Sequence, residues 1–250
     1  MIIKAATFNI QCGRNHEMRV RGESPEIDLD RVVAHIEKMD VDFCSINEIS
    51  DGLPGTGFGP QPAYLAQQLG WNYAFAKAIT VKSKSAPDRD YGIALLSKHP
   101  IRSFRKIPIV TLPEEREEGV RYENRVLMIV ELEINGKIVT VMNCHFGLRA
   151  LEVERAVETV LAAKETIAGP VVLTGDFNIQ PDHPKIQQIK AVFKDTADIR
   201  EDACLTFPSH EPRVKIDYIL TDEETKTLEL EIPQEVIADH LPMIATLEVK

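Results

Sequence analysis

The sequence predicts a layered α/β or α+β fold built on mixed β-sheets. Strand-like apolar runs alternate with amphipathic helical segments in the first half of the chain. An Asn135-Gly136 pair between two apolar runs marks a two-residue β-hairpin, and therefore antiparallel pairing, in the second half. With 250 residues, 44% of them hydrophobic and 27% charged, the chain has an ordinary globular composition, and we expect a single domain over residues 1–250.

The first two elements are a strand and a helix. Residues 1–10 form an apolar strand, and residues 28–40 show helical periodicity after the N-cap residue Asp28. We expect His35 at the surface, because it lies off the apolar stripe of this helix. The stripe consists of Leu29, Val32, Val33, Ile36 and Met39.

The next elements repeat this alternation. Residues 41–49 form an apolar strand that ends at an acid, Glu48. Pro62 near a first turn and Gly70 at an end predict a short helix over residues 62–70. Further strands are expected at about 72–79, 91–97 and 101–109.

The second half begins with the hairpin strands, residues 125–134 and 137–146. An apolar stripe predicts a helix over residues 150–168, which Gly169-Pro170 would end. A buried strand then runs over about 171–179, and shorter strands follow at 215–220, 227–232 and 242–249. Long polar loops are expected at 11–27, 80–90 and 111–124, and loops of this length are often functional.

Charge and motifs limit the classes of function. A net charge of −10 and a pI near 5.3 argue against non-specific binding to nucleic acid, because that affinity comes from clustered lysine and arginine. No run approaches the roughly 18–20 apolar residues that span a bilayer, and the N-terminus lacks a signal-peptide pattern. The four cysteines form no C-x-x-C pair. We expect a cytoplasmic monomer with reduced thiols, although a removed secretory leader would leave the same sequence.

Polar side chains interrupt or end several apolar runs. Each one alone is explained equally well by a turn, a cap or a strand-end hydrogen bond. Together they are harder to explain, because a buried carboxylate is costly unless it is paired or bound to a metal. If neighbouring parallel strands carry these residues at their C-terminal ends, the side chains converge on one crevice, where Mg²⁺ would take oxygen ligands. The residues are Asn9, Glu48, His145, Asp176, Asn178, Asp217, Asp239 and His240.

Seven short motifs in this order resemble the endonuclease/exonuclease/phosphatase family, which has the DNase I-like fold. They are TFNI, INEI, YGIALLSKHPI, NCHFGL, LTGDFN, KIDYIL and ADHLP, between residues 7 and 242. The resemblance implies a four-layer α/β sandwich, with two mixed, mainly antiparallel sheets packed face to face and helices outside. It also implies Mg²⁺- or Mn²⁺-dependent hydrolysis of phosphoesters.

The resemblance also implies roles for individual residues. Glu48 is similar to the family's main metal ligand, with Asn9 and Asp239 near the same ion. Asp176 resembles the residue that orients or deprotonates the attacking water, and Asn178 resembles a contact to phosphate or water. His145 and His240 resemble contacts to the phosphate and the transition state. Asp217 resembles a carboxylate that supports the metal or a histidine, and it is a better candidate than Asp239 to orient His240.

Three further residues bear on this comparison. Gln11 stands where some members carry an acid, which favours a single essential ion. Asn47 stands where many members have glutamine before the metal-binding glutamate. Arg149, four residues after His145, is a candidate for binding substrate phosphate, and a surface arginine at a helix start explains it equally well.

We therefore predict a metal-dependent phosphoesterase that acts on a small or lipid-derived phosphodiester or phosphomonoester. The alternative is a nuclease or DNA-repair phosphodiesterase on the same scaffold, which the acidic composition disfavours. A catalytically silent binding module is a third class, and the full set of site residues argues against it.

Overall fold

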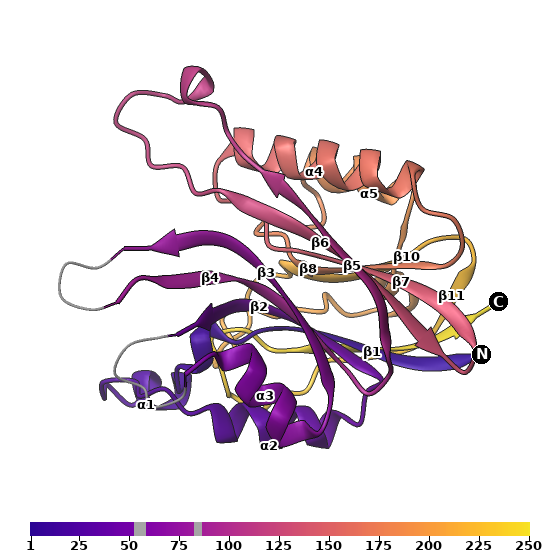
Figure 1. The fold of residues 1–250 in the computed structure, drawn as a ribbon, viewed down its shortest axis with the longest axis horizontal. Helices are drawn as coiled ribbons and strands as arrows, with labels where there is room; N and C mark the ends of the chain where they lie inside the picture. Colours follow the sequence, from indigo (N-terminus) through magenta and orange to yellow (C-terminus); the bar gives the residue numbers. More distant parts are fainter. Residues whose placement is uncertain (53–58, 83–86) are drawn as a thin grey trace.

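Two six-stranded mixed β-sheets form the centre of the molecule, a computed structural model that describes residues 1–52, 59–82 and 87–250 (Figure 1). The first sheet has the order β11-β12-β1-β2-β4-β3, and the second has the order β5-β6-β7-β8-β10-β9. The strands of the first sheet are β1 (Ile2–Asn9), β2 (Phe43–Asp51), β3 (Asn72–Val81), β4 (Arg89–Ser97), β11 (Thr225–Glu231) and β12 (Met243–Val249). Those of the second sheet are β5 (Ile101–Ile109), β6 (Arg125–Ile134), β7 (Lys137–Cys144), β8 (Val171–Asp176), β9 (Lys194–Asp195) and β10 (Asp217–Thr221).

Helices cover the outer face of each sheet, so the molecule has four layers. In Figure 1, α2 (Leu29–Met39) and α3 (Gln61–Leu69) lie below the first sheet, and α4 (Ala150–Glu165) and α5 (Pro184–Lys190) lie above the second. One apolar cluster fills the space between the sheets, and two others join each sheet to its helices. The predicted four-layer sandwich is confirmed. No helix in the described ranges is long and apolar enough to cross a membrane.

The central strands are paired in the same way in both sheets. β1 runs parallel to β2 and antiparallel to β12, and β8 runs parallel to β7 and antiparallel to β10. β1 and β8 are buried along almost their whole length, which suits continuous apolar runs covered on both faces. The tetrapeptide FNIQ occurs twice in the chain, once at the end of each of these equivalent strands. The two copies are placed differently, because Phe8 and Asn9 are the last residues of β1 whereas Phe177 and Asn178 follow β8.

The local signals in the sequence produced the expected elements. The Asp28 side chain accepts a hydrogen bond from the backbone of Arg31 and caps α2, and Gly70 ends α3 in the left-handed conformation. Asn135 and Gly136 both have positive φ and join β6 to β7 in a two-residue turn. Gly175 is needed for a close approach, because a Cβ there would lie 1.9 Å from the carbonyl oxygen of Cys144.

Several details differ from the sequence prediction. α4 ends at Glu165 and not at residue 168, because the Thr166 hydroxyl bonds to the carbonyl of Ala163 and caps the last turn. The expected loop at 11–27 contains α1 (His16–Val20), and α5 was not predicted. In the expected loop at 80–90, residues 83–86 lie outside the described residues.

The prediction that His35 lies at the surface is wrong. Its side chain is buried, its ring lies 5.7 Å from that of Phe8, and Nδ1 lies 3.4 Å from a carboxylate oxygen of Glu235. The segment between β11 and β12 crosses α2 and covers this flank, where Arg31 donates to the carbonyl of Val236. The apolar stripe of this helix depends only on residues within the helix, so it could not reveal that a distant segment of the chain buries His35.

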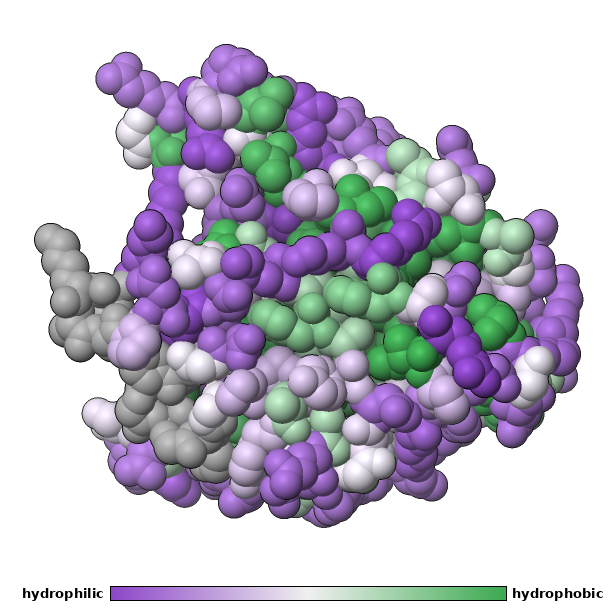
Figure 2. All heavy atoms as spheres, viewed as in Figure 1, coloured by the Kyte–Doolittle hydropathy of each residue, from purple (hydrophilic) through white to green (hydrophobic). Residues whose placement is uncertain are grey.

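The surface in Figure 2 is mainly hydrophilic around its rim. Hydrophobic residues gather in the middle of this face, over the region where Figure 1 shows the edge strands β3 and β5. Both strands carry partly exposed apolar side chains, among them Tyr73 and Phe104.

Candidate active site

The predicted site residues converge where the parallel strands of the two sheets end. β1 delivers Asn9, β2 delivers Glu48, and β8 delivers Asp176. The amide nitrogen of Asn9 donates to Asp176 Oδ2 at 3.0 Å and to Glu48 Oε1 at 3.2 Å, so the two sheets share one cluster. Asp217 enters differently from the parallel-strand expectation: it begins the antiparallel strand β10 and lies directly opposite Asp176.

Unusual backbone conformations turn two of these side chains into the crevice. Glu48 has a φ of 55°, and the pairing of β2 with β4 shifts register between Ile46 and Ile49 around it. Asn178 has a φ of 54° just after β8. Non-glycine residues in this region carry a cost of order 1–3 kcal/mol, and such residues cluster at functional sites.

Asp176 lies at the centre of the cluster and is almost fully buried. Its Oδ1 accepts a hydrogen bond from the backbone of Asn178 at 2.9 Å. Its Oδ2 lies 3.6 Å from Nε2 of both His145 and His240. Burial raises the pKa of Asp176, and the opposing attraction of His240 only partly offsets this effect.

His240 carries a positive charge within this cluster. Its Nδ1 lies 2.9 Å from Asp217 Oδ2. Burial lowers the pKa of His240, but Asp217 and Asp176 together outweigh burial and raise it well above the ordinary histidine value. Asp239, the neighbour in sequence, instead accepts a hydrogen bond from Gln11, so Asp217 is the carboxylate that orients His240.

His145 differs from His240 in charge. Burial lowers its pKa well below the ordinary value, and the nearby Arg125 and His240 lower it further. Its Nδ1 lies 3.2 Å from Nη1 of Arg125, and its Nε2 lies 3.1 Å from the amide nitrogen of Asn178. The site therefore contains one protonated and one neutral histidine.

A divalent cation fits better beside Glu48, Asn9 and Asp239 than beside the second acidic group in the crevice, which consists of Asp176, Asp217 and His240. Asp239 Oδ1 is buried and has no hydrogen-bond partner. Burial raises the pKa of Asp239, the charge of His240 partly offsets this effect, and the charge of Glu48 adds to it. Within the described residues no cationic side chain forms an ion pair with either carboxylate. A hard cation would supply the missing positive charge.

A second group could hold a metal by proximity alone. Asp176, Asp217 and His240 present ligand atoms within 4.8 Å of one another. This group already contains a positive charge, because Asp217 and Asp176 raise the pKa of His240, and Nδ1 of His240 is engaged by Asp217. An imidazolium has no lone pair for a metal, so the residues around Glu48 are the better candidates to hold a cation.

Two buried amides behind the site were not assigned a role from the sequence. Asn47 Nδ2 donates to Asn143 Oδ1 at 3.1 Å across the sheets, and Asn47 Oδ1 accepts from the backbone of Asp176 at 3.0 Å. Asn143 donates in turn to the carbonyls of Ile46 and Ala94. The signal in the sequence was a pair of asparagines inside apolar runs, but only the packed sheets show that these residues hold Asp176.

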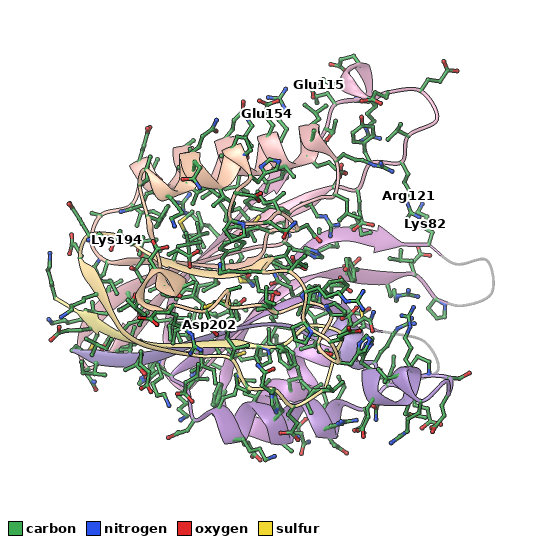
Figure 3. All side chains as sticks on the ribbon, turned by 180° about the vertical axis from the view of Figure 1, so that it is seen from behind. Lys82, Glu115, Arg121, Glu154, Lys194 and Asp202 are labelled. Atoms are coloured by element: carbon green, nitrogen blue, oxygen red, sulfur yellow. The ribbon has the colours of Figure 1, made fainter. Side chains whose placement is uncertain are left out.

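Arg149 and Arg125 show the limits of the sequence prediction in opposite ways. The side chain of Arg149 is exposed just before α4, and its backbone nitrogen donates to Glu152. Its role in substrate binding stays a prediction. Arg125, which was not singled out, is buried against His145. Figure 3 shows two further exposed cations, Lys82 and Arg121, near each other at one end of the molecule.

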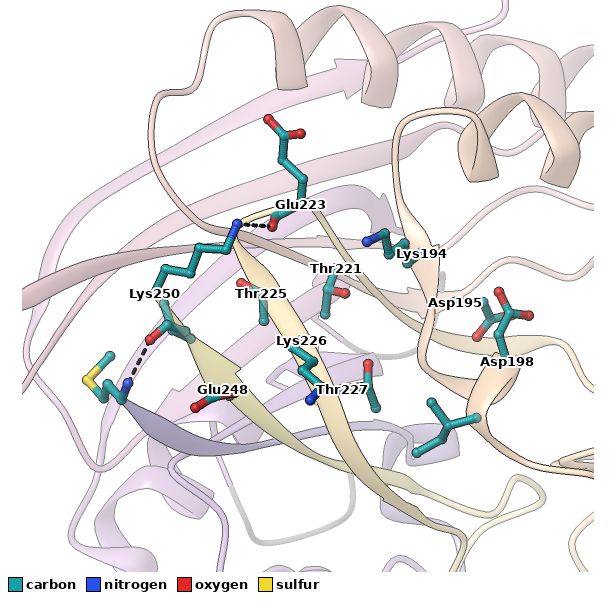
Figure 4. Close-up of a pocket in the computed structure, with 13 residues that line it drawn as sticks. Lys194, Asp195, Asp198, Thr221, Glu223, Thr225, Lys226, Thr227, Glu248 and Lys250 are labelled. Carbon is teal, nitrogen blue, oxygen red and sulfur yellow. Dashed lines mark hydrogen bonds between the residues drawn. The ribbon is translucent and has the colours of Figure 1, made fainter.

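A separate cavity lies at the end of the sandwich that holds both termini (Figure 4). It has a volume of about 830 Å³ and is lined by mixed charges, including Lys194, Glu223 and Lys226. Two buried hydroxyls in its wall, those of Thr221 and Thr225, have no hydrogen-bond partner. None of the predicted site residues lines it, so it takes no part in the chemistry of the crevice.

Comparison with known proteins agrees with this geometry. A sequence profile described as the endonuclease/exonuclease/phosphatase family matches residues 6–240. No curated protein matches the chain in sequence.

Solved structures with the same fold include family proteins from Beutenbergia cavernae and Bacteroides vulgatus. The first is 21% identical, with a TM-score of 0.75 over 99% of this chain and 72% of that chain. The second is 20% identical, with a TM-score of 0.75 over all of both chains. A mannosyl-6-phosphatase from Bacteroides thetaiotaomicron is 16% identical, with a TM-score of 0.73 over 98% of this chain and 99% of that chain.

Proposed function

The chain belongs to the endonuclease/exonuclease/phosphatase family, and from this premise we propose that it is a divalent-metal-dependent phosphoesterase acting on a small or lipid-derived substrate. Enzymes of this family are generally hydrolases of phosphoester bonds that use divalent metals. The observation that carries the proposal is the position of Asp176. It is a buried carboxylate between two histidines, and the amide of Asn9 connects it to Glu48.

We propose that Asp176 holds and deprotonates the attacking water. A general base should have a pKa close to the working pH, and burial moves the pKa of Asp176 upward in that direction. Hydrogen bonds from Asn9 and the backbone of Asn178 fix both carboxylate oxygens. Such fixed geometry supports in-line attack, which is the main requirement of phosphoryl transfer.

His240, His145 and Asn178 would stabilise the negative charge that develops on the phosphoryl oxygens. His240 brings a full positive charge, held in place by Asp217. The amide of Asn178 is anchored by donation to the carbonyl of Phe146 at 3.0 Å. Preorganised donors of this kind are worth about 10²–10³ in turnover each.

The metal ion would be held by Glu48, Asn9 and Asp239, which provide oxygen ligands suited to Mg²⁺ or Mn²⁺. When bound, it would neutralise the non-bridging oxygens and stabilise the leaving oxygen. Gln11 donates a hydrogen bond to Asp239 Oδ2 at 2.6 Å. The neutral amide of Gln11 therefore occupies a position where an acidic side chain would offer the metal a further ligand. This contact supports a single essential ion.

A small substrate is supported by charge and space. The net charge of −10 disfavours long polyanions. A cavity of about 450 Å³ adjoins Asn178 and is lined by residues that include Gln180, His183 and Val214. Its size suits the non-reacting part of a small ligand. The mannosyl-6-phosphatase with the same fold is consistent with a sugar phosphate as one candidate.

A hydrolysis screen tests this proposal: free phosphate is measured for the monoesters, and the released alcohol or the new monoester is measured for the diesters. The panel comprises sugar phosphates, nucleotides, inositol phosphates, phospholipids, sphingomyelin and DNA, with bis-p-nitrophenyl phosphate as a generic diester. We expect hydrolysis with Mg²⁺ or Mn²⁺ that EDTA abolishes and Glu48→Ala eliminates, whereas the surface variant Glu133→Ala stays active. Plasmid nicking at physiological salt without small-substrate turnover would favour the nuclease. No hydrolysis of any phosphoester would refute the enzyme.

A further inference from the structure

Arg125 is a buried charge that the proposed mechanism does not use. It is the first residue of β6 and is 9% exposed. Its Nη1 lies 3.0 Å from Glu123 Oε1 and 3.2 Å from His145 Nδ1, and its Nε is buried without a hydrogen-bond partner. Burying a guanidinium is costly, and one partly exposed carboxylate is a modest compensation.

In the hydrogen bond between Arg125 and His145, only Arg125 can be the donor. A guanidinium is always protonated in proteins and has donors but no acceptor. His145 Nδ1 must therefore accept, which requires an unprotonated Nδ1. Because His145 is neutral, its single ring proton must lie on Nε2.

The other neighbour of His145 favours the opposite tautomer. Asn178 Nδ2 lies 3.1 Å from Nε2 and would donate to it if the ring proton were on Nδ1. In that tautomer the Nδ1–H would face the N–H of a charged guanidinium at 3.2 Å. Charge-assisted hydrogen bonds are about twice as strong as neutral ones, so Arg125 prevails over Asn178.

We propose that Arg125 is a positioning residue that holds His145 in the neutral tautomer with its proton on Nε2. The Nε2–H of His145 and the second amide hydrogen of Asn178 are then both donors beside Asp176, and one phosphoryl oxygen can accept from both. His145 serves as a hydrogen-bond donor and not as the base, which leaves Asp176 as the proton acceptor. This part of the inference rests on the proposed function, whereas the tautomer itself does not.

The tautomer can be measured without any substrate. Long-range ¹H–¹⁵N correlation spectra of metal-free protein labelled at histidine would be recorded at about pH 8, where ordinary histidines are neutral. His145 is assigned by the loss of its signals in His145→Gln. We expect Nε2 to be protonated in the wild type and in Arg125→Lys, which keeps a cationic donor. In Arg125→Met, which has no donor, we expect the proton to move to Nδ1.

Kinetics provide the second readout. On a substrate found by the screen, we expect Arg125→Met to lower kcat about 100-fold with KM changed less than about threefold, and Arg125→Lys to recover at least about tenfold of the loss. Arg102→Met is the matched control, because Arg102 is also a strand residue paired with a glutamate but lies on the surface.

Two results would overturn the proposal: a wild-type His145 protonated on Nδ1, or an Nε2 proton that persists in Arg125→Met. If Arg125 served only as the ion-pair partner of Glu123, the tautomer would not change. If Arg125→Met does not fold, the wild-type spectrum decides alone. If the wild type hydrolyses no phosphoester, the proposed function fails, and the spectra still decide the role of Arg125.

Discussion

Replacement of Asp176 by asparagine separates the water-activating role of this residue from metal binding. The substitution keeps the shape of the side chain and removes its negative charge. In the structure, Oδ1 accepts from the backbone of Asn178 and Oδ2 accepts from the amide of Asn9. An asparagine side chain has one carbonyl oxygen, so one of these two donors would face an NH₂ group.

The expected effect on stability is small. One lost buried hydrogen bond costs about 1–3 kcal/mol. The substitution also removes the cost of burying a carboxylate, which the raised pKa of Asp176 reflects. We therefore expect the free energy of unfolding to change by less than about 2 kcal/mol, measured by urea denaturation.

The expected effect on turnover is large. Loss of a general base lowers kcat by about 10²–10⁴, which corresponds to about 3–5 kcal/mol of transition-state stabilisation. Mn²⁺ affinity, measured by isothermal titration calorimetry, should change less than about threefold. The reason is that Asp176 bonds to the amide nitrogen of Asn9 and not to the oxygen of that amide. Asp176 also makes no hydrogen bond to Glu48 or Asp239, the two carboxylates proposed to bind the ion.

Asp198→Asn is the control, because Asp198 is an exposed acid paired with Lys190 far from the crevice. A kcat within tenfold of the wild type would refute the assignment of Asp176 as the base. An equal loss of Mn²⁺ affinity and turnover would show that Asp176 is a ligand.

Three other predictions follow from the same geometry. Glu48→Gln should lower Mn²⁺ affinity at least about tenfold in calorimetry, because it removes a ligand charge; unchanged affinity would contradict the proposed metal position. Asn47→Leu should lower the free energy of unfolding by about 2–4 kcal/mol in urea denaturation, because it leaves the backbone N–H of Asp176 and the side-chain oxygen of Asn143 unpaired; a loss below about 0.5 kcal/mol would refute this bridge. Burial lowers the pKa of His35, so this histidine takes up its proton at a higher pH in the unfolded chain than in the folded chain. The contribution of neutral His35 to the free energy of unfolding is therefore complete above about pH 6.5 and is lost as the pH falls below that value. His35→Leu should reduce the slope of the free energy of unfolding against pH, by up to about 1.4 kcal/mol per pH unit, between pH 7.5 and about 5.5. An identical slope in the variant would contradict the burial argument.

The fold class could be read from the sequence because its signals are local. Asp28 caps a helix, Gly70 ends one, and Asn135-Gly136 makes a hairpin through bonds within a few residues. These signals missed α5 and the end of α4, which depend on capping contacts that a periodic pattern does not contain.

The residue types of the site were also visible in the sequence, because acids, amides and histidines inside apolar runs are costly. Their partners were not. Asn9 and Asp176 are 167 positions apart, and Asp217 meets Asp176 only through the register of β8 and β10. Arg125 looked like the polar start of a strand until β6 and β7 placed it against His145.

The sequence by itself determined the order of elements, the family and the set of polar side chains that the chain brings to the ends of its strands. Only the tertiary structure decided how charge and protons are shared among them: a cationic His240 between two carboxylates, a neutral His145 beside an arginine, and an unpartnered oxygen on Asp239. The physical reason is that a pKa, a tautomer and a ligand set depend on burial and on neighbours within about 4–6 Å, and in this chain those neighbours come from distant segments.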